Sequence, residues 1–300
     1  MPVPPRRPPQ LRGRVFRGSQ AIARGLLTKN ELRSSAWRSL FRDIYIDAQV
    51  PVSHRVRCTA AARWLIPEHA AIAGRAAAAL YGATEVALDD PIDIIVPRGT
   101  RFGPVAGLRV HTSRMAPDDV TKRDGIAVTT PHRTCWDLAR WLDVVEAVAV
   151  TDALMARRLV TVDSLREYAL SRAGDRGWRR TLRVADLVDG GAESPQESRL
   201  RVRLVLAGLP KPWTQYVVSD ENGRFVARLD LAWPEFKVGV EYDGVWHNDA
   251  EQFHRDRRRL NRLLTADWIV LYVTARRLRE DFAGVVSEIR AALRSRRSLP

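Results

Sequence analysis

The C-terminal third of the chain alternates helix, strand and turn signals in an order that few folds accommodate. Ser194 suits the start of a helix and Gly208 its end. The following segment, WTQYVVSDENGRFVARLDLAWPEFKVGVEYDG, contains three strand-like runs. Residues 221–223 (Glu-Asn-Gly) join the first two runs as a hairpin, and Pro234 separates the second from the third. A basic helix, a strand and a helix follow, so an αβββαβα domain is predicted over residues 191–300.

Carboxylates in this segment occupy positions that are unfavourable for isolated charges. Asp230 is expected to end the second strand, and Glu241 and Asp243 lie two apart on the third, which puts them on one face. Glu197 can reach the same place from the preceding helix. Because unpaired buried carboxylates are costly, their convergence needs a cation, and carboxylate oxygens suit Mg²⁺ or Mn²⁺. Asp230, Glu241 and Asp243 are the predicted metal ligands, with Glu197 beside them.

Two side chains after the third strand are of types that could bind or hydrolyse a phosphodiester. His247 follows a short turn and can act as a general acid or base, or as a further ligand. Trp246 beside it can stack on a nucleic-acid base. A metal ion at the adjacent carboxylates would activate water and offset charge on the phosphate. The catalytic set predicted here is Glu197, Asp230, Glu241, Asp243 and His247.

The helix-and-strand carboxylate pattern resembles the PD-(D/E)XK nuclease fold, which is also called restriction-endonuclease-like. The stretch DLAWPEFKVGVEYDGVWH is most similar to the very-short-patch-repair-like endonuclease family, over about residues 193–295. The resemblance implies Asp230 as the main metal ligand, Glu197 and Glu241 as supporting acids, and His247 near the scissile phosphate.

One position departs from the general pattern of that fold. Most members carry Lys two residues after the strand carboxylate, where this chain has Asp243. The repair-type branch also lacks this Lys and uses histidine. Lys237 shares the strand parity of Glu241 but is about 13 Å away at ~3.3 Å per residue, too far to replace it. An arginine from the helix after His247 is the better candidate.

Structural interpretations of the same residues remain open. Glu197 has the spacing of a helix-capping residue, and Asp243 before a glycine suits ordinary turn chemistry. Asp230 and Glu241 could also be structural charges that pair with arginines, and His247 an exposed loop residue.

A basic helix follows the predicted site and suits contact with a DNA backbone. Its sequence HRDRRRLNR places cations beside an acidic cleft, where phosphates would need neutralising; a solvated helix face is the alternative. The predicted contacts are Arg255, Arg257, Arg258, Arg259 and Arg262.

The first fifty residues favour a second DNA-binding element. Residues 1–15 hold five Pro and four Arg, which predicts a disordered basic tail. Residues 16–50 are predicted to form a winged helix-turn-helix, with the capping-box spacing at Thr28 and Glu31 and a third helix over SSAWRSLF. That third helix would hold Arg33, Arg38 and Arg42 near DNA. A small helical cap on the next domain is the alternative.

Residues 51–190 read as a mixed α/β and helical region. The segments AIAGRAAAALYGA and AVTTPHRTCWDLAR look helical, and IDIIVPRG and LRVHTS look like strands. With the opening helices, they resemble type IV abortive-infection antitoxins, a family of transcriptional regulators, over about residues 15–150. Arg133 and Asp137 lie four apart and are expected to support their helix.

Charge and cysteine content narrow the functional classes. The net charge of +14 divides as +7, +1 and +6 over residues 1–50, 51–250 and 251–300, which favours a polyanionic partner. Two cysteines exclude a disulfide scaffold, and since both precede the nuclease-like segment no zinc site is expected there. No apolar run has the length of a membrane span, and the N-terminus lacks a secretory signal, so a cytoplasmic protein is expected.

Together these patterns predict a multi-domain α/β protein that binds DNA and carries a Mg²⁺- or Mn²⁺-dependent endonuclease domain. The main alternative is a transcriptional regulator or antitoxin-like protein whose nuclease-fold domain only binds nucleic acid or a protein partner. A mismatch or lesion nickase is a third hypothesis. The sequence leaves homodimerisation open.

Overall fold

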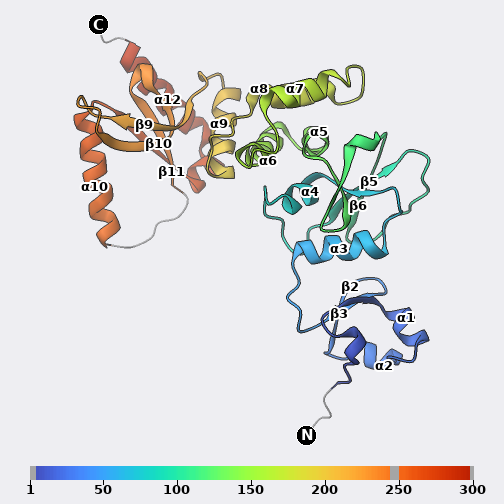
Figure 1. Ribbon diagram of the computed structural model, residues 1–300. Helices are drawn as coiled ribbons and strands as arrows, with labels where there is room; N and C mark the ends of the chain where they lie inside the picture. Colours follow the sequence, from blue (N-terminus) through green and yellow to red (C-terminus); the bar gives the residue numbers. More distant parts are fainter. Residues whose placement is uncertain (1–4, 244–249, 298–300) are drawn as a thin grey trace. The chain divides into compact units, whose positions relative to one another are not determined.

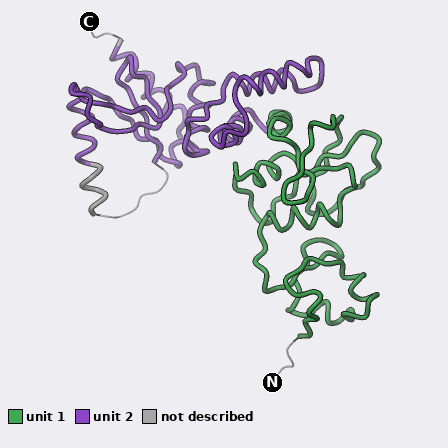
Figure 2. Tube along the Cα trace, in the orientation of Figure 1, with its two compact units in different colours: residues 1–141 green, residues 142–300 purple. Residues whose placement is uncertain are grey.

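The chain is a mixed α/β protein with two compact units, residues 1–141 and 142–300 (Figures 1 and 2). The structure is a computed structural model that describes residues 5–243 and 250–297; for residues 250–256 and 297 only the backbone is described. Within these described segments, no helix combines the length and apolarity that crossing a membrane requires.

A small antiparallel sheet and two short helices form the N-terminal part of the first unit. The sheet order is β1-β3-β2, and Leu11, Phe16 and Trp37 belong to the core beneath it. Thr28 and Glu31 form the predicted capping box at the start of α2. The elements are β1 (Val15–Arg17), α1 (Gly18–Ala23), α2 (Lys29–Leu32), β2 (Trp37–Phe41) and β3 (Ile44–Asp47).

The predicted third helix of this part is wrong, because residues 37–41 are strand β2. A tight turn with Asp43 at φ 63° returns the chain, and Trp37 pairs with Asp47 of β3. Arg38 therefore projects from an exposed strand position, Arg42 lies in the turn, and Arg33 caps the C-terminus of α2. The aromatic spacing fits a helix face and a strand equally well, and the hairpin turn decides between them.

The prediction of a disordered tail over residues 1–15 is also wrong for its second half. Residues 9–11 form a 3₁₀ turn, and Leu11 is buried in the local core. Asp47 is buried and accepts hydrogen bonds from Arg7 and from the backbone of Gly13 (2.9 Å). A buried carboxylate that needs donors therefore holds this proline-rich segment in place. Residues 1–4 lie outside the described chain.

The middle of the first unit is built on a five-stranded mixed sheet of order β6-β5-β4-β8-β7. Its inner strand β5 is almost fully buried, as the run IDIIV predicts. The elements are α3 (His54–Trp64), β4 (Ala71–Ile72), α4 (Gly74–Leu80), β5 (Ile92–Pro97), β6 (Leu108–Ser113), β7 (Val120–Arg123), β8 (Ile126–Thr129) and α5 (Pro131–Trp141).

Helices α6 to α8 belong to the second unit, so the division falls after residue 141 and not at the predicted 190/191. A buried ion pair joins α6 to α9: Arg201 donates to Asp152 at 2.8 Å, and the backbone of Asp189 donates to the same carboxylate at 2.7 Å. The bounds are α6 (Val144–Ala156), α7 (Val162–Leu170), α8 (Trp178–Leu187) and α9 (Pro195–Leu206).

The C-terminal sheet has the order β12-β11-β10-β9, with β11 and β12 parallel and the other pairs antiparallel. The predicted order of helix, three strands, helix, strand and helix is confirmed, with the short helix α11 added before the last. One apolar core contains Leu200, Trp233 and Ile289, and a second contains Leu229, Leu263 and Trp268. The elements are β9 (Trp213–Ser219), β10 (Phe225–Trp233), β11 (Val238–Asp243), α10 (Ala250–Thr265), β12 (Ile269–Thr274), α11 (Ala275–Glu280) and α12 (Phe282–Arg297).

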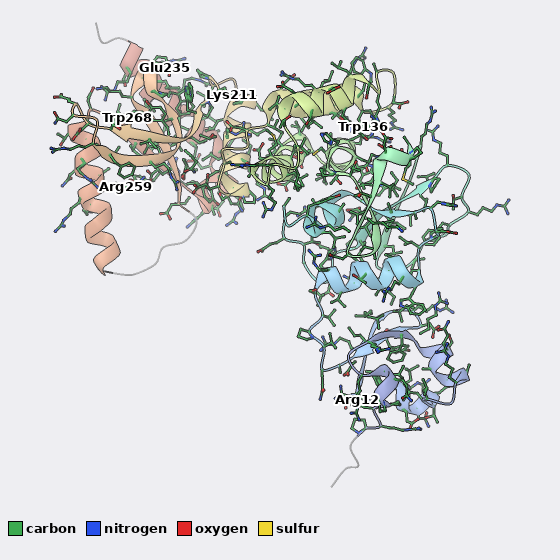
Figure 3. All side chains as sticks on the ribbon, viewed as in Figure 1. Arg12, Trp136, Lys211, Glu235, Arg259 and Trp268 are labelled. Atoms are coloured by element: carbon green, nitrogen blue, oxygen red, sulfur yellow. The ribbon has the colours of Figure 1, made fainter. Side chains whose placement is uncertain are left out.

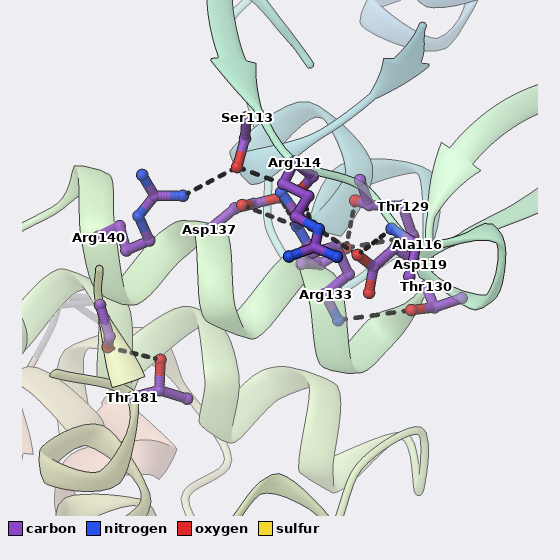
Figure 4. A network of polar contacts seen from close by, with 12 residues as sticks. Ser113, Arg114, Ala116, Asp119, Thr129, Thr130, Arg133, Asp137, Arg140 and Thr181 are labelled. Atoms are coloured by element: carbon purple, nitrogen blue, oxygen red, sulfur yellow. Dashed lines mark hydrogen bonds and ion pairs between the residues drawn. The ribbon is translucent and has the colours of Figure 1, made fainter. Parts of the chain in front are cut away.

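A buried charge network stabilises the first unit (Figure 4). Arg133 donates to Asp119 at 2.6 Å and to both oxygens of Asp137 at 3.1 Å, and all three side chains are nearly inaccessible. Arg133 therefore ties helix α5 to the 3₁₀ turn that contains Asp119 (117–119), which goes beyond the expected support within one helix.

We expect Arg133→Met to destabilise the first unit by about 3–5 kcal/mol, because it leaves two buried carboxylates without their guanidinium. Burial raises the pKa of Asp137 to about 7 even with Arg133 present. A carboxyl with a raised folded-state pKa destabilises the fold once the pH rises above that pKa. Because Arg133 lowers the pKa of Asp137, the loss of stability in the variant should be larger at pH 8 than at pH 5. Urea unfolding at both values measures this. Arg98→Met, at an exposed position, is the control; an equal effect there would contradict the interpretation.

Candidate carboxylate site

The candidate site lies where the backbone ladder between β10 and β11 stops. Pairing ends at Leu231 with Val240, and Asp230 and Glu241 are the next residues on the two strands. Asp230 lies inside β10, so the prediction that it ends this strand is wrong. On the other side, the register of β9 with β10 brings Gln215 opposite Asp230.

Glu197 reaches the site from the first turn of α9. Its backbone NH donates to the Ser194 hydroxyl at 3.2 Å, which confirms the predicted helix cap. Its carboxylate accepts from the backbone of Glu193 at 3.0 Å and from the Gln215 amide at 2.8 Å, and the residue is only 8% exposed. The same residue therefore takes part in the helix cap through its backbone NH and contacts strand β9 through its carboxylate.

Gln215 connects two of the carboxylates and was missed by the sequence analysis. Its Nε2 donates to Glu197 and, at a longer 3.4 Å, to Asp230. Its Oε1 is buried and has no hydrogen-bond partner in the described part of the chain. Gln215 has a φ of 50°, a strained conformation for a non-glycine residue. The only sequence signal was a polar residue inside a strand-like run.

Asp230 is held in a half-buried position. Its Oδ2 accepts a 2.8 Å hydrogen bond from the backbone NH of Tyr242. Burial raises the pKa of Asp230, and the nearby charge of Glu197 adds to this shift; the Tyr242 NH opposes it. Its charge is thus costly at neutral pH and would gain from a cation.

Glu241 is paired with an arginine from the basic helix. Arg259 donates to both carboxylate oxygens of Glu241, through Nη1 at 2.7 Å and through Nη2, and Nη2 also donates to the Arg228 carbonyl at 2.7 Å. Burial disfavours the charged guanidinium, but the hydrogen bonds and charge of Glu241 outweigh it and raise the pKa of Arg259. Among the described side chains at the site, three are carboxylates and one, Arg259, is a guanidinium.

The remaining predicted residues divide into three groups. Asp243 ends β11 and pairs through its backbone with Thr274, and no described contact joins its carboxylate to Asp230 or Glu241. Arg257, Arg258 and Arg262 are exposed on α10. The residues Trp246 and His247, and the side chain of Arg255, lie outside the described part.

Lys237 does not lie on the strand of Glu241. It adopts a left-handed conformation before β11, and its ammonium is 3.8 Å from Asp267. As the sequence analysis expected, the cation beside Glu241 comes from the helix after His247.

The side-chain atoms at the site are of the type that binds a hard divalent cation. Asp230, Glu241 and the unpartnered Oε1 of Gln215 are oxygen donors, as Mg²⁺ and Mn²⁺ require. Within the described residues, however, no three His, Cys, Asp or Glu side chains converge closely enough to hold a metal ion. Glu241 is instead engaged by Arg259, so ion binding would require that pair to open.

Comparison with known proteins finds only distant similarity. A scan of protein-family models gives no match. The uncharacterized proteins MT2308 and Rv2248 of two Mycobacterium tuberculosis strains are each 29% identical over 223 residues, covering 74% of this chain and 80% of theirs. The crystal structure of the RV2827C protein from Mycobacterium tuberculosis aligns with a TM-score of 0.41 and 15% identity, over 69% of this chain and 83% of that one. Such a similarity supports no inference about function.

We expect Asp230→Asn to raise the melting temperature of the protein by a few degrees at pH 7. The wild-type carboxyl has a raised folded-state pKa, so its stabilising contribution is present at low pH and lost as pH rises through that pKa. The gain should therefore shrink at pH 4. Thermal unfolding at both values is the measurement, with exposed Glu235→Gln as the control (Figure 3). A variant less stable than wild type at pH 7 would contradict the assignment.

Proposed function

We propose that the C-terminal half of the chain is a metal-dependent endonuclease that hydrolyses DNA phosphodiester bonds. The observation that carries this proposal is that Asp230 and Glu241 follow the last pair of one strand ladder, with Glu197 joined to Asp230 through Gln215. They come from a helix and two neighbouring strands, as the resemblance to restriction-endonuclease-like folds implies.

Each residue of the site has a defined task in this proposal. Asp230 and Glu241 would hold Mg²⁺ or Mn²⁺, and the Gln215 carbonyl oxygen is available beside them. The ion would lower the pKa of bound water and offset charge on the phosphate. Glu197 fixes the Gln215 amide through a 2.8 Å hydrogen bond and so orients both Gln215 and Asp230. Asp243 and His247 remain proposed as an outer ligand and a proton-transfer group.

Arg259 supplies the positive charge that Lys provides in most nucleases of this fold. Its guanidinium lies directly on Glu241, so a scissile phosphate near that carboxylate would lie within reach of it. Arginine suits this task because its planar fork binds phosphate oxygens in pairs. The exposed cations of α10 would contact DNA beside the carboxylates, and Arg38 and Arg42 of the first unit would contact DNA through the surface of their own unit.

A non-enzymatic regulator is the second candidate, and one observation favours it. Glu241 is already neutralised by Arg259, which is how a carboxylate would be satisfied in a domain that binds no metal. In that case, the N-terminal part would act as a winged-helix-type DNA reader and the C-terminal unit as a binding module.

Cleavage assays separate the two functions. Purified full-length protein should nick supercoiled plasmid in the presence of Mn²⁺ or Mg²⁺ and not in the presence of EDTA. Asp230→Ala and Glu241→Ala should each reduce the rate by at least about 100-fold, because both remove a metal ligand. Gel quantification of nicked plasmid over time is the measurement.

The matched control is Glu235→Ala, which removes an exposed carboxylate from the turn between β10 and β11. It should cleave at the wild-type rate. If wild-type protein never nicks plasmid with either ion while it still binds the plasmid, the regulator is the correct assignment.

Arg259→Ala should separate ion binding from catalysis. Since Arg259 competes with the cation for Glu241, its removal should tighten Mn²⁺ binding several-fold. Nicking should nevertheless slow by about 10²–10³-fold, as for loss of a group that stabilises transition-state charge. Free Mn²⁺ is measured by electron paramagnetic resonance in the absence of DNA. Weaker Mn²⁺ binding by the variant would contradict the proposed competition.

A further inference from the structure

The outward face of helix α8 carries closely spaced arginines. Thr181, Val184 and Ala185 are buried and define the inner face of this helix, which packs beside α7 (Figure 1). The opposite face and the turn before it carry four exposed cations, which we call the α8 arginine stripe: Arg176, Arg179, Arg180 and Arg183.

The position of these cations is unfavourable for the helix itself. Arg179 and Arg180 lie in the first turn, next to the positive end of the helix dipole, where acidic residues would be stabilising. The first turn contains no acidic residue, and Gly177 at the N-cap has no side chain to cap it. Local helix stability therefore does not explain the cations at these positions.

The segment that carries the stripe has an excess of positive charge. Asp186 on the same helix pairs with Arg166 of α7 at 2.7 Å. Between residues 171 and 185 there are five Arg and one acid, Asp175, so the segment has a net charge of +4.

An aromatic ring supports one member of the stripe. The Arg179 guanidinium carbon lies 5.1 Å from the centre of the Trp178 ring, within the range of a cation–π contact. Such a contact restricts the guanidinium without using its hydrogen-bond donors. Its donors therefore stay available to a planar partner such as phosphate.

We propose that the α8 arginine stripe binds the phosphate backbone of duplex DNA. Arg179 and Arg183 are four residues apart, about 6 Å along the helix. A duplex carries one phosphate per about 3.4 Å along each strand, so two cations about 6 Å apart span nearly two phosphate steps. This contact needs no divalent cation and stands apart from the carboxylate site, so it holds whether or not the protein cleaves DNA.

Salt-dependent binding in EDTA tests the proposal without any cleavage. The full-length variant Arg176→Gln/Arg179→Gln/Arg183→Gln is titrated against a fluorescent duplex of ~25 base pairs at roughly 50–200 mM salt, with anisotropy as the readout. We expect the slope of log K against log salt to fall in magnitude by about 2–3, at roughly 0.9 per lost phosphate contact. Affinity should fall at least about tenfold at any duplex sequence.

Two further variants make the result specific. Arg98→Gln/Arg101→Gln/Arg224→Gln removes the same charge from exposed positions elsewhere and should leave the slope near the wild-type value. Arg176→Lys/Arg179→Lys/Arg183→Lys keeps the charge and should retain the wild-type slope. The proposal is overturned if the stripe variant and the scattered variant change equally, or if the stripe variant binds duplex DNA like wild type. Stripe-dependent binding to duplex RNA but not to duplex DNA would also overturn it.

Discussion

The C-terminal unit depends on a short series of hydrogen bonds from Glu197 through Gln215 to Asp230. It joins helix α9 to the edge strand β9 and the central strand β10 at the point where the β10–β11 ladder stops. Gln215 adopts an unfavourable backbone conformation there, and its side-chain carbonyl oxygen has no hydrogen-bond partner among the described residues. Strained backbone and unpaired buried atoms are expected at functional sites more than in a purely structural sheet.

The other buried carboxylates of the described chain have positively charged partners. Asp119, Asp137 and Asp152 each contact a guanidinium directly, and Asp47 is bonded to Arg7. Among the described residues at the ladder end, Glu241 has such a partner, while Glu197 and Asp230 share the neutral amide of Gln215. A divalent ion would have the charge and the donor preference to compensate the carboxylates that lack a guanidinium.

Elements that are determined by nearby residues could be predicted from the sequence, and those that depend on distant contacts could not. Helix caps at Ser194 and Thr28 and the 221–223 hairpin were predictable because residues within four positions determine them. Strand β2 was not, because its aromatic spacing also fits a helix. Gln215 could not have been found without the register of β9, and the Glu241–Arg259 pair spans eighteen positions. The packing of residues 7–15 depends on the buried Asp47, which no local pattern shows.

In the proposed nuclease, Arg259 and a metal ion would use the same carboxylate at different stages. A crystal structure with Mn²⁺ and a short DNA duplex tests this account most directly through the anomalous signal of the ion. The account predicts an anomalous peak bound by oxygens of Asp230 and Glu241, with the Arg259 guanidinium moved from Glu241 to a phosphate. No peak at these carboxylates, with the Arg259–Glu241 pair intact beside bound DNA, would contradict it.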